Sequence, residues 1–307
     1  MGKSLRVAYG ESLVKVAEKN DKIVVLDADL AGATMTSIFK AAYPERHFDC
    51  GIAEGNMVGI AAGMAASGLI PFVSTFAIFG AGRAFEQIRN SVAYPKLNVK
   101  FGLSHSGLSV GEDGGSHQSI EDVALMREMP GMTVFVPCDP TEMEKAVNAA
   151  LEINGPVYIR TGRPNVDDVT TAETPFIPGK INVMREGTDV CIMANGLMIP
   201  KALEAAELLA AEGISAEVAN VHTVKPIDEE YCLAAAEKFK VIVTAEEHSI
   251  IGGLGSAVAE VIAGKGGAKF DRVGIMDKFG HSGKPDQLFA EYGLTAANIV
   301  AKVKAAL

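Results

Sequence analysis

The sequence contains no tryptophan, aromatic residues make up only 6% of it, and its four cysteines lie far apart. None of these (Cys50, Cys138, Cys191 and Cys232) forms a C-x-x-C pair, so the sequence indicates neither a zinc site nor a disulfide framework. Basic residues are also few, because 28 Lys and Arg stand against 38 Asp and Glu, a net charge of −10. They are scattered along the chain, so we expect no nucleic acid and no anionic membrane as a partner.

Residues 55–82 carry no charge and are the one candidate for a membrane span. Gly68, Pro71 and Gly80 divide this stretch into pieces shorter than the roughly 20 apolar residues that a transmembrane helix needs. The N-terminal residues, which include Lys3 and Arg6, lack the apolar run of a signal peptide. We therefore expect a cytoplasmic protein with reduced thiols.

Apolar runs alternate with amphipathic segments up to residue 160, which is typical of a mainly parallel, doubly wound α/β sheet. Strands are expected at 22–27, 69–75, 98–103, 132–136 and 156–160, and helices at 6–20, 55–67, 80–92, 119–128 and 140–153. Proline, glycine and threonine dominate 161–180, as in a linker.

A second, shorter α/β series follows this stretch. Its expected strands are 189–194, 215–220, 240–244 and 271–275, and its expected helices are 198–212, 228–238, 253–263 and 295–305. This region has the size of a complete domain. The sequence therefore predicts two doubly wound α/β domains, 1–165 and 181–307, joined by a linker at 166–180.

The stretch from Cys50 to Gly68 contains a single acid, Glu54, where a glycine-punctuated turn gives way to a run of small apolar residues. One interpretation is a first-turn acid that stabilises the N-terminus of a buried helix. The other is a carboxylate held in a dry, apolar pocket, where it binds one ligand atom. The local pattern leaves both interpretations open.

A second candidate site is the irregular segment 104–118, which follows an expected strand and precedes a helix. It contains His105, Glu112, Asp113 and His117 together with four glycines. Ligands of parallel sheets bind beyond the carboxyl ends of the strands, and loops on such a scaffold often hold reacting groups. No third residue completes a zinc spacing, so the segment predicts a substrate-binding loop and no metal site.

Several motifs together resemble the transketolase family in order and spacing. They are Gly51-Ile52-Ala53-Glu54-Gly55-Asn56-Met57, Ser74-Thr75-Phe76-Ala77-Ile78-Phe79, Ser104-His105, Gly111-Glu112-Asp113-Gly114 and Ser116-His117-Gln118. The resemblance extends from Arg6 to near the C-terminus, where it includes Ile250-Ile251-Gly252-Gly253-Leu254-Gly255-Ser256 and Phe279-Gly280-His281-Ser282-Gly283. It implies a thiamine-diphosphate pyrimidine-binding domain over 1–165 and a transketolase C-terminal domain over 181–307.

One motif of such enzymes is missing. They hold Mg2+ and the diphosphate with a Gly-Asp-Gly sequence, and the nearest string here is Glu112-Asp113-Gly114. The resemblance therefore implies the C-terminal subunit of a split transketolase of the pentose phosphate pathway. Its expected partners are an N-terminal, diphosphate-binding subunit that holds most of the Mg2+ contacts, a second copy of this chain in a heterotetramer, and sugar phosphates.

The resemblance also implies a role for three residues toward thiamine diphosphate. Glu54 would hydrogen-bond a pyrimidine nitrogen and favour the imino tautomer that removes the thiazolium proton. Phe76 and Phe79 would pack near the pyrimidine ring. Gly82 stands where some members have a further aromatic residue.

Substrate contacts are implied for five positions. His117 would contact hydroxyls around the donor carbonyl, and Asp113 the hydroxyl next to the acceptor aldehyde. Arg6, His105 and Arg163 match positions that bind the sugar phosphate, and Arg suits bidentate recognition of phosphate.

Three further positions qualify this substrate site. Asp29 matches an acid near the family's active site, with a turn role as the alternative. Arg160 is the alternative to its neighbour Arg163 as a phosphate ligand. Ala33 stands where the family commonly has a serine near the phosphate, although Thr34 and Thr36 are close in sequence.

Three other assignments remain open beside a transketolase subunit. They are the matching part of a 1-deoxyxylulose-5-phosphate synthase, the β subunit of a 2-oxoacid dehydrogenase, and a scaffold that has lost catalysis. His105 and Gly111-Glu112-Asp113-Gly114 favour the transketolase pattern over the synthase. A scaffold is expected to lose Glu54 or His117, and both are present.

Overall fold

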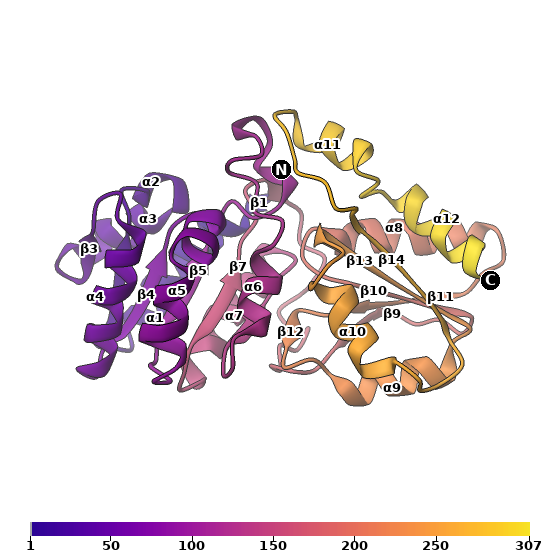
Figure 1. Cartoon of the computed structure of the whole chain (residues 1–307), viewed down its shortest axis with the longest axis horizontal. Coiled ribbons are helices and arrows are strands. Elements are labelled where there is room, and N and C mark those ends of the chain that lie inside the picture. The colour runs from indigo at the N-terminus through magenta and orange to yellow at the C-terminus, as the bar shows by residue number, and fades with distance from the viewer. Residues whose placement is uncertain (1) are drawn as a thin grey trace.

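The computed structural model describes residues 2–307 and consists of two α/β lobes that lie side by side (Figure 1). A seven-stranded sheet forms the first lobe and a five-stranded sheet the second. The order in the first sheet is β12 (Thr223–Lys225), β6 (Thr133–Phe135), β7 (Val157–Arg160), β5 (Lys100–Leu103), β4 (Ile70–Ser74), β2 (Ile23–Asp27) and β3 (His47–Asp49). All neighbours are parallel except β12 and β6.

The second sheet repeats this plan on a smaller scale. Its order is β14 (Lys269–Ile275), β13 (Val241–Ser249), β10 (Val190–Ala194), β11 (Ala216–Asn220) and β9 (Asn182–Arg185), and only β9 is antiparallel to its neighbour. A short ribbon pairs β1 (Lys3–Ser4) with β8 (Asn165–Val166). The expected α/β class with two doubly wound domains is confirmed.

Helices cover both faces of each sheet. Those of the first lobe are α1 (Leu5–Ala17), α2 (Ala31–Thr34), α3 (Thr36–Ala42), α4 (Glu54–Ala66), α5 (Phe85–Gln87), α6 (Asp122–Glu128) and α7 (Pro140–Glu152). Those of the second are α8 (Met198–Ala211), α9 (Glu229–Lys238), α10 (Leu254–Ile262), α11 (Pro285–Glu291) and α12 (Ala296–Ala306). Local sequence fixes several starts: Asp139 accepts a hydrogen bond from the Glu142 amide at 2.7 Å, and Pro140 occupies the first turn of α7.

The expected helix 80–92 has a different form. The chain makes two π-helical turns, Ile78–Arg83 and Ile88–Ala93, on either side of α5. Gly80 allows this turn to pack closely, because a Cβ there would lie 2.4 Å from Leu103 Cδ1. Wide turns of this kind are rare and occur often at functional sites.

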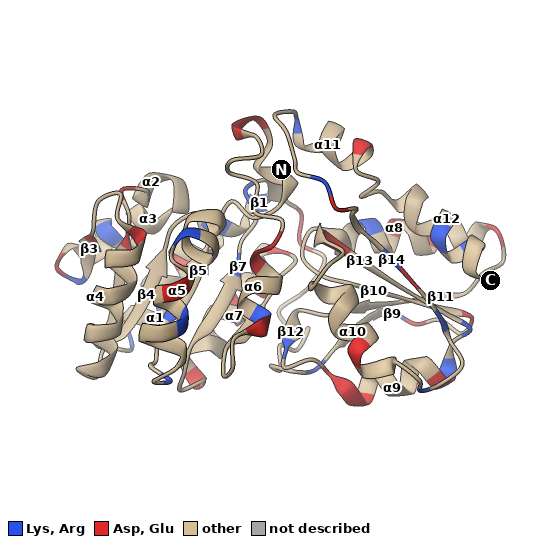
Figure 2. Cartoon of the chain, in the orientation of Figure 1, with Lys and Arg blue, Asp and Glu red and all other residues tan. Residues whose placement is uncertain are grey.

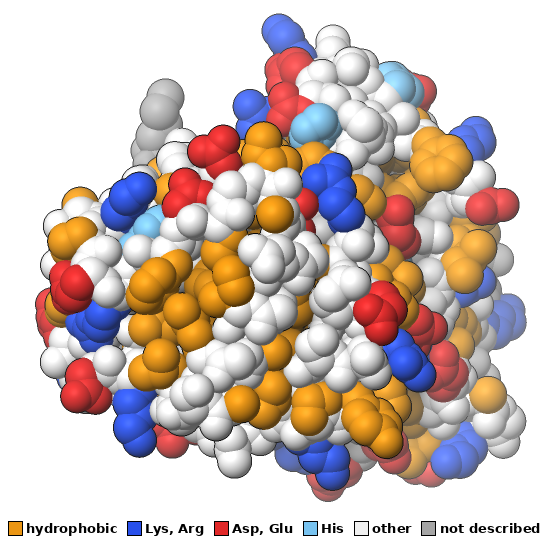
Figure 3. Space-filling view, turned by 60° about the vertical axis from the view of Figure 1, so that its left-hand side comes forward, with side chains coloured by type: hydrophobic (Ala, Val, Ile, Leu, Met, Phe, Trp, Pro, Cys, Tyr) orange, Lys and Arg blue, Asp and Glu red, His pale blue; other side chains and the backbone are white. Residues whose placement is uncertain are grey.

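Charge is distributed unevenly over the first lobe. Apart from its first residue, α4 carries no charged side chain, and its ribbon is almost entirely tan in Figure 2. The end of the molecule that carries α4 shows hydrophobic and uncharged side chains across its middle and most charged ones toward its margin (Figure 3). Ile52, Ile60 and Tyr94 are exposed in this lobe.

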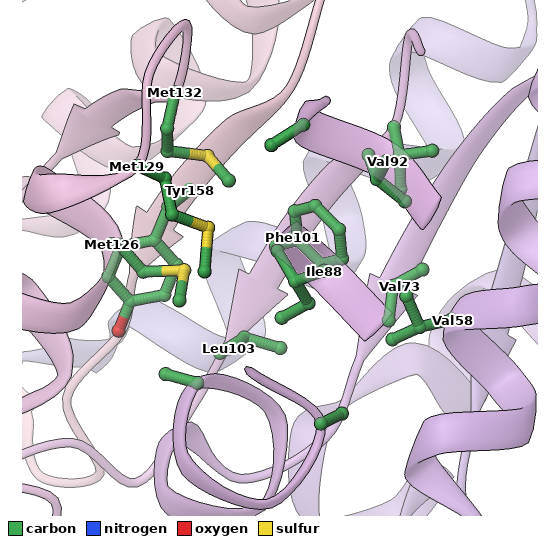
Figure 4. Close-up of a cluster of buried hydrophobic side chains, with 14 of the residues drawn as sticks. Val58, Val73, Ile88, Val92, Phe101, Leu103, Met126, Met129, Met132 and Tyr158 are labelled. Atoms are coloured by element: carbon green, nitrogen blue, oxygen red, sulfur yellow. The ribbon is translucent and has the colours of Figure 1, made fainter. Parts of the chain in front are cut away.

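Alternate residues of each central strand enter different cores. On β2, Val24 and Leu26 pack into a cluster with α4 and α6, whereas Ile23 and Val25 pack into a cluster with α1 and α7. Figure 4 shows part of the first cluster, in which Phe101 lies among side chains from several elements. Burying a side chain of this size stabilises a fold by about 1.5–3 kcal/mol. Alternation of this kind explains the nearly continuous apolar runs of the strands.

The chain between the two lobes is packed against both of them. Phe176 lies between Phe135 of the first sheet and His222, with ring centroids 5.2 and 4.1 Å away. Asp139 accepts hydrogen bonds from the amides of Val169 and Thr170 at 2.8 and 2.6 Å. Strand β12 comes from beyond this segment and yet completes the first sheet. The two lobes are therefore joined by strand pairing of the backbone and by side-chain contacts.

Several short elements have no counterpart among the expected ones: β3, β9, β12, α2, α3 and α11. They span three to seven residues each and lack a run long enough to show a period. Over residues 2–307, no helix has the length and apolar character that a crossing of the bilayer requires.

Candidate active site

Glu54 is the first residue of α4, and its side chain is only 3% exposed. Ala53 precedes it and provides no side-chain cap. Both carboxylate oxygens accept hydrogen bonds from Arg83 Nη1, at 2.9 and 3.0 Å. The carboxylate thus has a specific side-chain partner at the positive end of the helix dipole.

The environment of this carboxylate differs from a dry, apolar pocket, which was one of the two interpretations of the sequence. Arg83 ends the first π-helical turn, its side chain is 53% exposed, and its guanidinium lies 4.3 Å from the Phe79 ring centroid. A cation therefore stands beside Glu54, because the turn after β4 folds back over the start of α4. Sequence reasoning missed Arg83, although it is the first charged residue after the uncharged stretch 55–82.

Four aromatic rings extend the site from Arg83 across the sheet edge. Phe76 stacks on Phe79 with centroids 5.7 Å apart and on His105 with centroids 3.8 Å apart. His117 approaches Phe79 edge-on at 5.3 Å and Phe76 at 6.1 Å. The structure thus brings Phe76, Phe79, His105 and His117, all named from the sequence, into one cluster. Ring faces of this kind suit a flat heterocycle.

His105 follows β5 in a left-handed backbone conformation, with φ of +56°. Non-glycine residues rarely adopt this conformation, and such strain is concentrated at functional sites. Its Nδ1 lies 2.9 Å from Ser104 Oγ. Burial, followed by the positive charges of Arg6 and Arg163, lowers the pKa of His105 to about 3. At neutral pH His105 is therefore an uncharged hydrogen-bonding group.

Arg6 and Arg163 form a cationic pair beside this histidine. Arg6 Nη2 donates to the Arg163 carbonyl at 3.1 Å and Nη1 to the Ala33 carbonyl at 2.6 Å. Arg163 Nη1 donates to the Val110 carbonyl. Burial and the neighbouring Arg163 charge lower the pKa of Arg6. The two positive charges repel each other, and an anion bound beside both would reduce that repulsion.

Arg160, the alternative to Arg163, is committed elsewhere. It is buried and donates from Nε and Nη2 to the two oxygens of Asp122, at 2.7 and 3.1 Å. Thr34 and Thr36 are also buried and bond to Leu30 and Asp27, so they offer no hydroxyl in place of Ala33. Arg163, which is partly exposed, is the better anion ligand of the pair.

Asp29 and Asp113 lie at the same edge of the sheet, where both are exposed. The Asp29 backbone has φ of +60°, and its amide donates to Asp49 Oδ1 at 3.0 Å. Neither carboxylate bonds to the ring cluster in the described part of the chain. No group of three or more His, Cys, Asp and Glu side chains within residues 2–307 has the arrangement of a metal site.

Two family models match nearly the whole chain. The model described as "Transketolase, pyrimidine binding domain" covers residues 2–168, and the one described as "Transketolase, C-terminal domain" covers 179–299.

Individual relatives of similar length also match. A protein named as a transketolase C-terminal section from Methanocaldococcus jannaschii is 47% identical over 304 residues, 98% of this chain and 95% of its own length. A protein from Clostridium sp. named as a 6-deoxy-6-sulfo-D-fructose transketolase subunit is 47% identical over 296 residues, 96% of this chain and 92% of its own length.

A solved structure described as a split gene transketolase, inactive beta4 tetramer, superimposes with a TM-score of 0.91 at 51% identity, covering 100% of this chain and 99% of that one. Longer proteins match over part of their length. A 1-deoxy-D-xylulose-5-phosphate synthase from Geobacter sulfurreducens is 39% identical over 97% of this chain, which spans only 47% of that protein.

Proposed function

The chain belongs to the transketolase family, and we propose that it is the C-terminal subunit of a two-polypeptide transketolase that moves a two-carbon ketol unit between sugar phosphates. The observation that carries the proposal is the cluster of Glu54, Phe76, Phe79 and His117 at one sheet edge. It occurs in a chain whose sequence contains no Gly-Asp-Gly. These observations support the assignment of half of a thiamine-diphosphate site to this chain.

The donor set fits the pyrimidine half of thiamine diphosphate. Glu54 offers a buried carboxylate that can accept a hydrogen bond from a ring nitrogen. Phe76 and Phe79 offer stacked rings that Arg83 connects to this carboxylate. When bound, the cofactor supplies the nucleophilic carbon that attacks the donor ketose. We assign the diphosphate and Mg2+ mainly to the partner subunit.

The chain's own residues would divide the remaining work. Glu54 would hold the proton on the pyrimidine nitrogen, with Arg83 fixing the carboxylate through two hydrogen bonds. The phenylalanine pair would exclude water from the ring face. His117 and Asp113 would bind sugar hydroxyls, and uncharged His105 would donate or accept a hydrogen bond at the anionic end.

Arg6 and Arg163 would anchor the anionic group of the sugar. Arg6 donates to the Arg163 carbonyl and lies close enough to the Arg163 charge for its own pKa to be lowered, so we expect little reorganisation when the anion binds. Asp29 would lie at the edge of the same pocket. Asp29 and Asp113 are exposed in this chain, which is expected if another polypeptide completes the pocket over them.

The uncharged surface of α4 supports a partner at this edge. Asn56, Gly59, Ile60 and Gly63 are exposed along the helix, and no charge accompanies them. A stripe of small and apolar residues on the surface is typical of a protein interface. We propose that the N-terminal subunit packs here and that two copies of each chain form a heterotetramer.

The test is reconstitution. The purified chain alone should show negligible ketol transfer and weak thiamine diphosphate binding, and addition of the subunit that carries Gly-Asp-Gly should restore both. The assay would pair several ketose and aldose phosphates and follow product by coupled oxidation. Full activity of this chain alone would contradict the split-subunit proposal.

A sulfonated sugar is a second candidate substrate, because one of the 47% identical relatives is named for 6-deoxy-6-sulfo-D-fructose. A sulfonate presents oxygens to Arg6 and Arg163 much as a phosphate does. The same reconstituted pair should be offered both donors. A kcat/KM that is at least about tenfold higher for the sulfonate would assign the sulfonated sugar as substrate.

Pyruvate discriminates a further alternative. The chain is also similar to a 1-deoxy-D-xylulose-5-phosphate synthase, so that reaction is an alternative function. A synthase of this kind would use pyruvate as the donor. Turnover of pyruvate with a triose phosphate, without ketol transfer, would favour the synthase. Cofactor binding without turnover of any donor would favour a scaffold.

A further inference from the structure

The second sheet presents its carboxyl edge to the first lobe. The residues at the ends of β10, β11 and β13 are buried, and they are Asn195, Asn220, His222, Glu246, Glu247 and His248. In doubly wound folds this edge is the usual place for a ligand. Here its contacts are with the first lobe, which lies beside it in Figure 1: Ser109 of the 104–118 segment, Ala124 of α6 and Glu142 of α7.

Glu247 contacts the loop that carries Asp113 and His117. It is 2% exposed, and its Oε1 accepts a hydrogen bond from the Ser109 amide at 2.7 Å. The loop comes so close because Gly107 has no side chain: a Cβ there would lie 2.2 Å from Glu247 Oε1. Gly107 also has φ of +75°, which favours glycine. The loop backbone is therefore shaped around this carboxylate.

Other contacts hold Glu247 itself in place. Its carbonyl accepts a hydrogen bond from Arg160 Nη2 at 3.0 Å, and Arg160 is fixed by Asp122. Two residues later the Ser249 amide donates to the Ile120 carbonyl at 2.8 Å. The end of β13 is thus a rigid support that runs beside the first lobe's loop.

The far side of the same loop is held by a second segment of the second lobe. Gln118 Nε2 donates to the His281 carbonyl at 3.0 Å and to the Gly111 carbonyl at 3.2 Å. The loop also packs closely against the residue after His281, because a Cβ on Gly114 would lie 2.6 Å from Ser282 Oγ. Residues 107–118 are therefore enclosed from two directions, and they carry Asp113 and His117.

We propose that Glu247 is a positioning residue: by binding the Ser109 amide, its carboxylate fixes the loop that presents Asp113 and His117, and so gives the second domain a role at the active site. The proposal rests on the function proposed above. It also accounts for two sequence motifs that the cofactor chemistry leaves unused, Glu246-Glu247-His248 and Phe279-Gly280-His281.

The cost of this arrangement argues for a role beyond packing. Burial raises the pKa of Glu247 to about 7, and its Oε2 has no hydrogen-bond partner among the described residues. Burying a carboxyl group with one unpaired oxygen costs more free energy than burying an apolar side chain. A group of this kind is retained where its directed hydrogen bond is needed.

The first experiment measures the loop in this chain alone by amide hydrogen exchange. In Glu247→Ala, exchange within 107–118 should become at least about tenfold faster, because the Ser109 amide loses its acceptor. Glu217→Ala is the matched control: Glu217 is also a buried acid of the second lobe, but it bonds to Tyr231 and Lys238. Unchanged exchange at 107–118 in Glu247→Ala would overturn the proposal, whatever the enzyme's reaction is.

The second experiment uses the reconstituted pair. Glu247→Ala should lower kcat/KM for the acceptor by about tenfold or more while the Kd for thiamine diphosphate stays within about twofold. Glu247→Gln should recover most of the loss, since its amide oxygen can accept the Ser109 hydrogen bond. A parallel loss of cofactor binding, or no rescue by Gln, would indicate general destabilisation and overturn the proposal. A wild-type pair without ketol transfer would instead overturn the proposed function and leave the exchange result intact.

Discussion

The two lobes use the same edge of a parallel sheet in different ways. In the first lobe the carboxyl ends of the strands carry partly exposed side chains, among them His117 and Arg163, beside the buried Glu54. In the second lobe the corresponding residues, such as Asn220 and Glu247, are buried against the first lobe. One edge is thus open to ligand and the other is filled by protein. The difference shows that polar residues at the ends of parallel strands can be covered by another domain as well as left accessible.

The sharpest test of the open edge is Glu54→Ala in the reconstituted pair. We expect kcat to fall by about 10²–10⁴-fold, the usual range for loss of a group that manages a proton. Assembly should persist by size-exclusion chromatography, because Glu54 bonds within this chain. Glu18→Ala, an exposed acid at the end of α1, is the control and should keep full activity. An active Glu54→Ala enzyme would remove Glu54 from the mechanism.

The contacts between the lobes can be weakened by removing Asp139. This residue caps α7 and accepts hydrogen bonds from Val169 and Thr170 in the segment between the lobes. Asp139→Ala should lower the free energy of unfolding by about 3 kcal/mol, since one cap and three further hydrogen bonds are lost. For a chain of this size that is a fall in Tm of roughly 5 °C, measured by calorimetry.

Asp168→Ala is the matched control for this change. Asp168 accepts a hydrogen bond from Thr141 in the same first turn, at 3.0 Å, but in an exposed position. Its removal should cost less than about 1 kcal/mol. Equal losses for the two variants would show that the buried network at Asp139 contributes nothing special.

Arg163→Met tests the anion site of the open edge. KM for the sugar phosphate should rise by about 10–100-fold, because a hydrogen bond to a charged group contributes about 1.5–3 kcal/mol. The same sugar without its phosphate should show no change, which makes the substrate its own control. Steady-state kinetics on the reconstituted pair would measure both. A similar loss for both sugars would place Arg163 outside the anion site.

The smallest expected effect is a pH dependence of folding stability that arises from Glu142 at the filled edge. Burial raises the pKa of Glu142 to about 7, against an ordinary value of 4.5, and its carboxyl bonds Cys138 and Asn220. The folded state therefore holds a proton that the unfolded state releases, so this contribution to stability is present at low pH and is lost as pH rises from about 4.5 to 7. Between pH 5 and pH 8 it amounts to about 2 kcal/mol.

Glu142→Gln should remove that dependence. Denaturant unfolding at pH 5 and pH 8 should show the wild-type chain losing about 2 kcal/mol more than the variant. The comparison cancels other titrating groups, such as His222, whose pKa burial lowers to about 4. Identical pH profiles for the two chains would contradict the assignment to Glu142.

Most of the α/β framework was predictable because its strands are apolar on both faces. Ile23–Asp27 and Val190–Ala194 are examples of such strands. Their side chains are buried on both faces because helices cover both sides of the sheet, so nearly every residue is apolar. Short elements escaped prediction for a physical reason: β12 has three residues and is stabilised by pairing with β6, almost ninety positions earlier in the chain. The local sequence pattern around β12 does not indicate that it pairs with so distant a strand.

The candidate site shows the same division. Glu54, the phenylalanine pair and His117 were identifiable from motifs, and the structure brings them together, while their catalytic roles stay predictions. Arg83 was not identified, because only the π-helical turn places it over Phe79 and against Glu54. Arg160 was an alternative from sequence and is excluded by its bond to Asp122.

The α/β class, the two-domain pattern and the residue types at the open edge could be predicted, because they follow from periodicity and from motifs along the chain. Tertiary structure alone decided which acids are buried and what they bind. Glu54 faces Arg83, and Glu247 faces the Ser109 amide, 138 positions away. The free-energy cost of burying a carboxylate depends on the partner that folding brings to it, and that partner cannot be predicted from the neighbouring residues in the sequence.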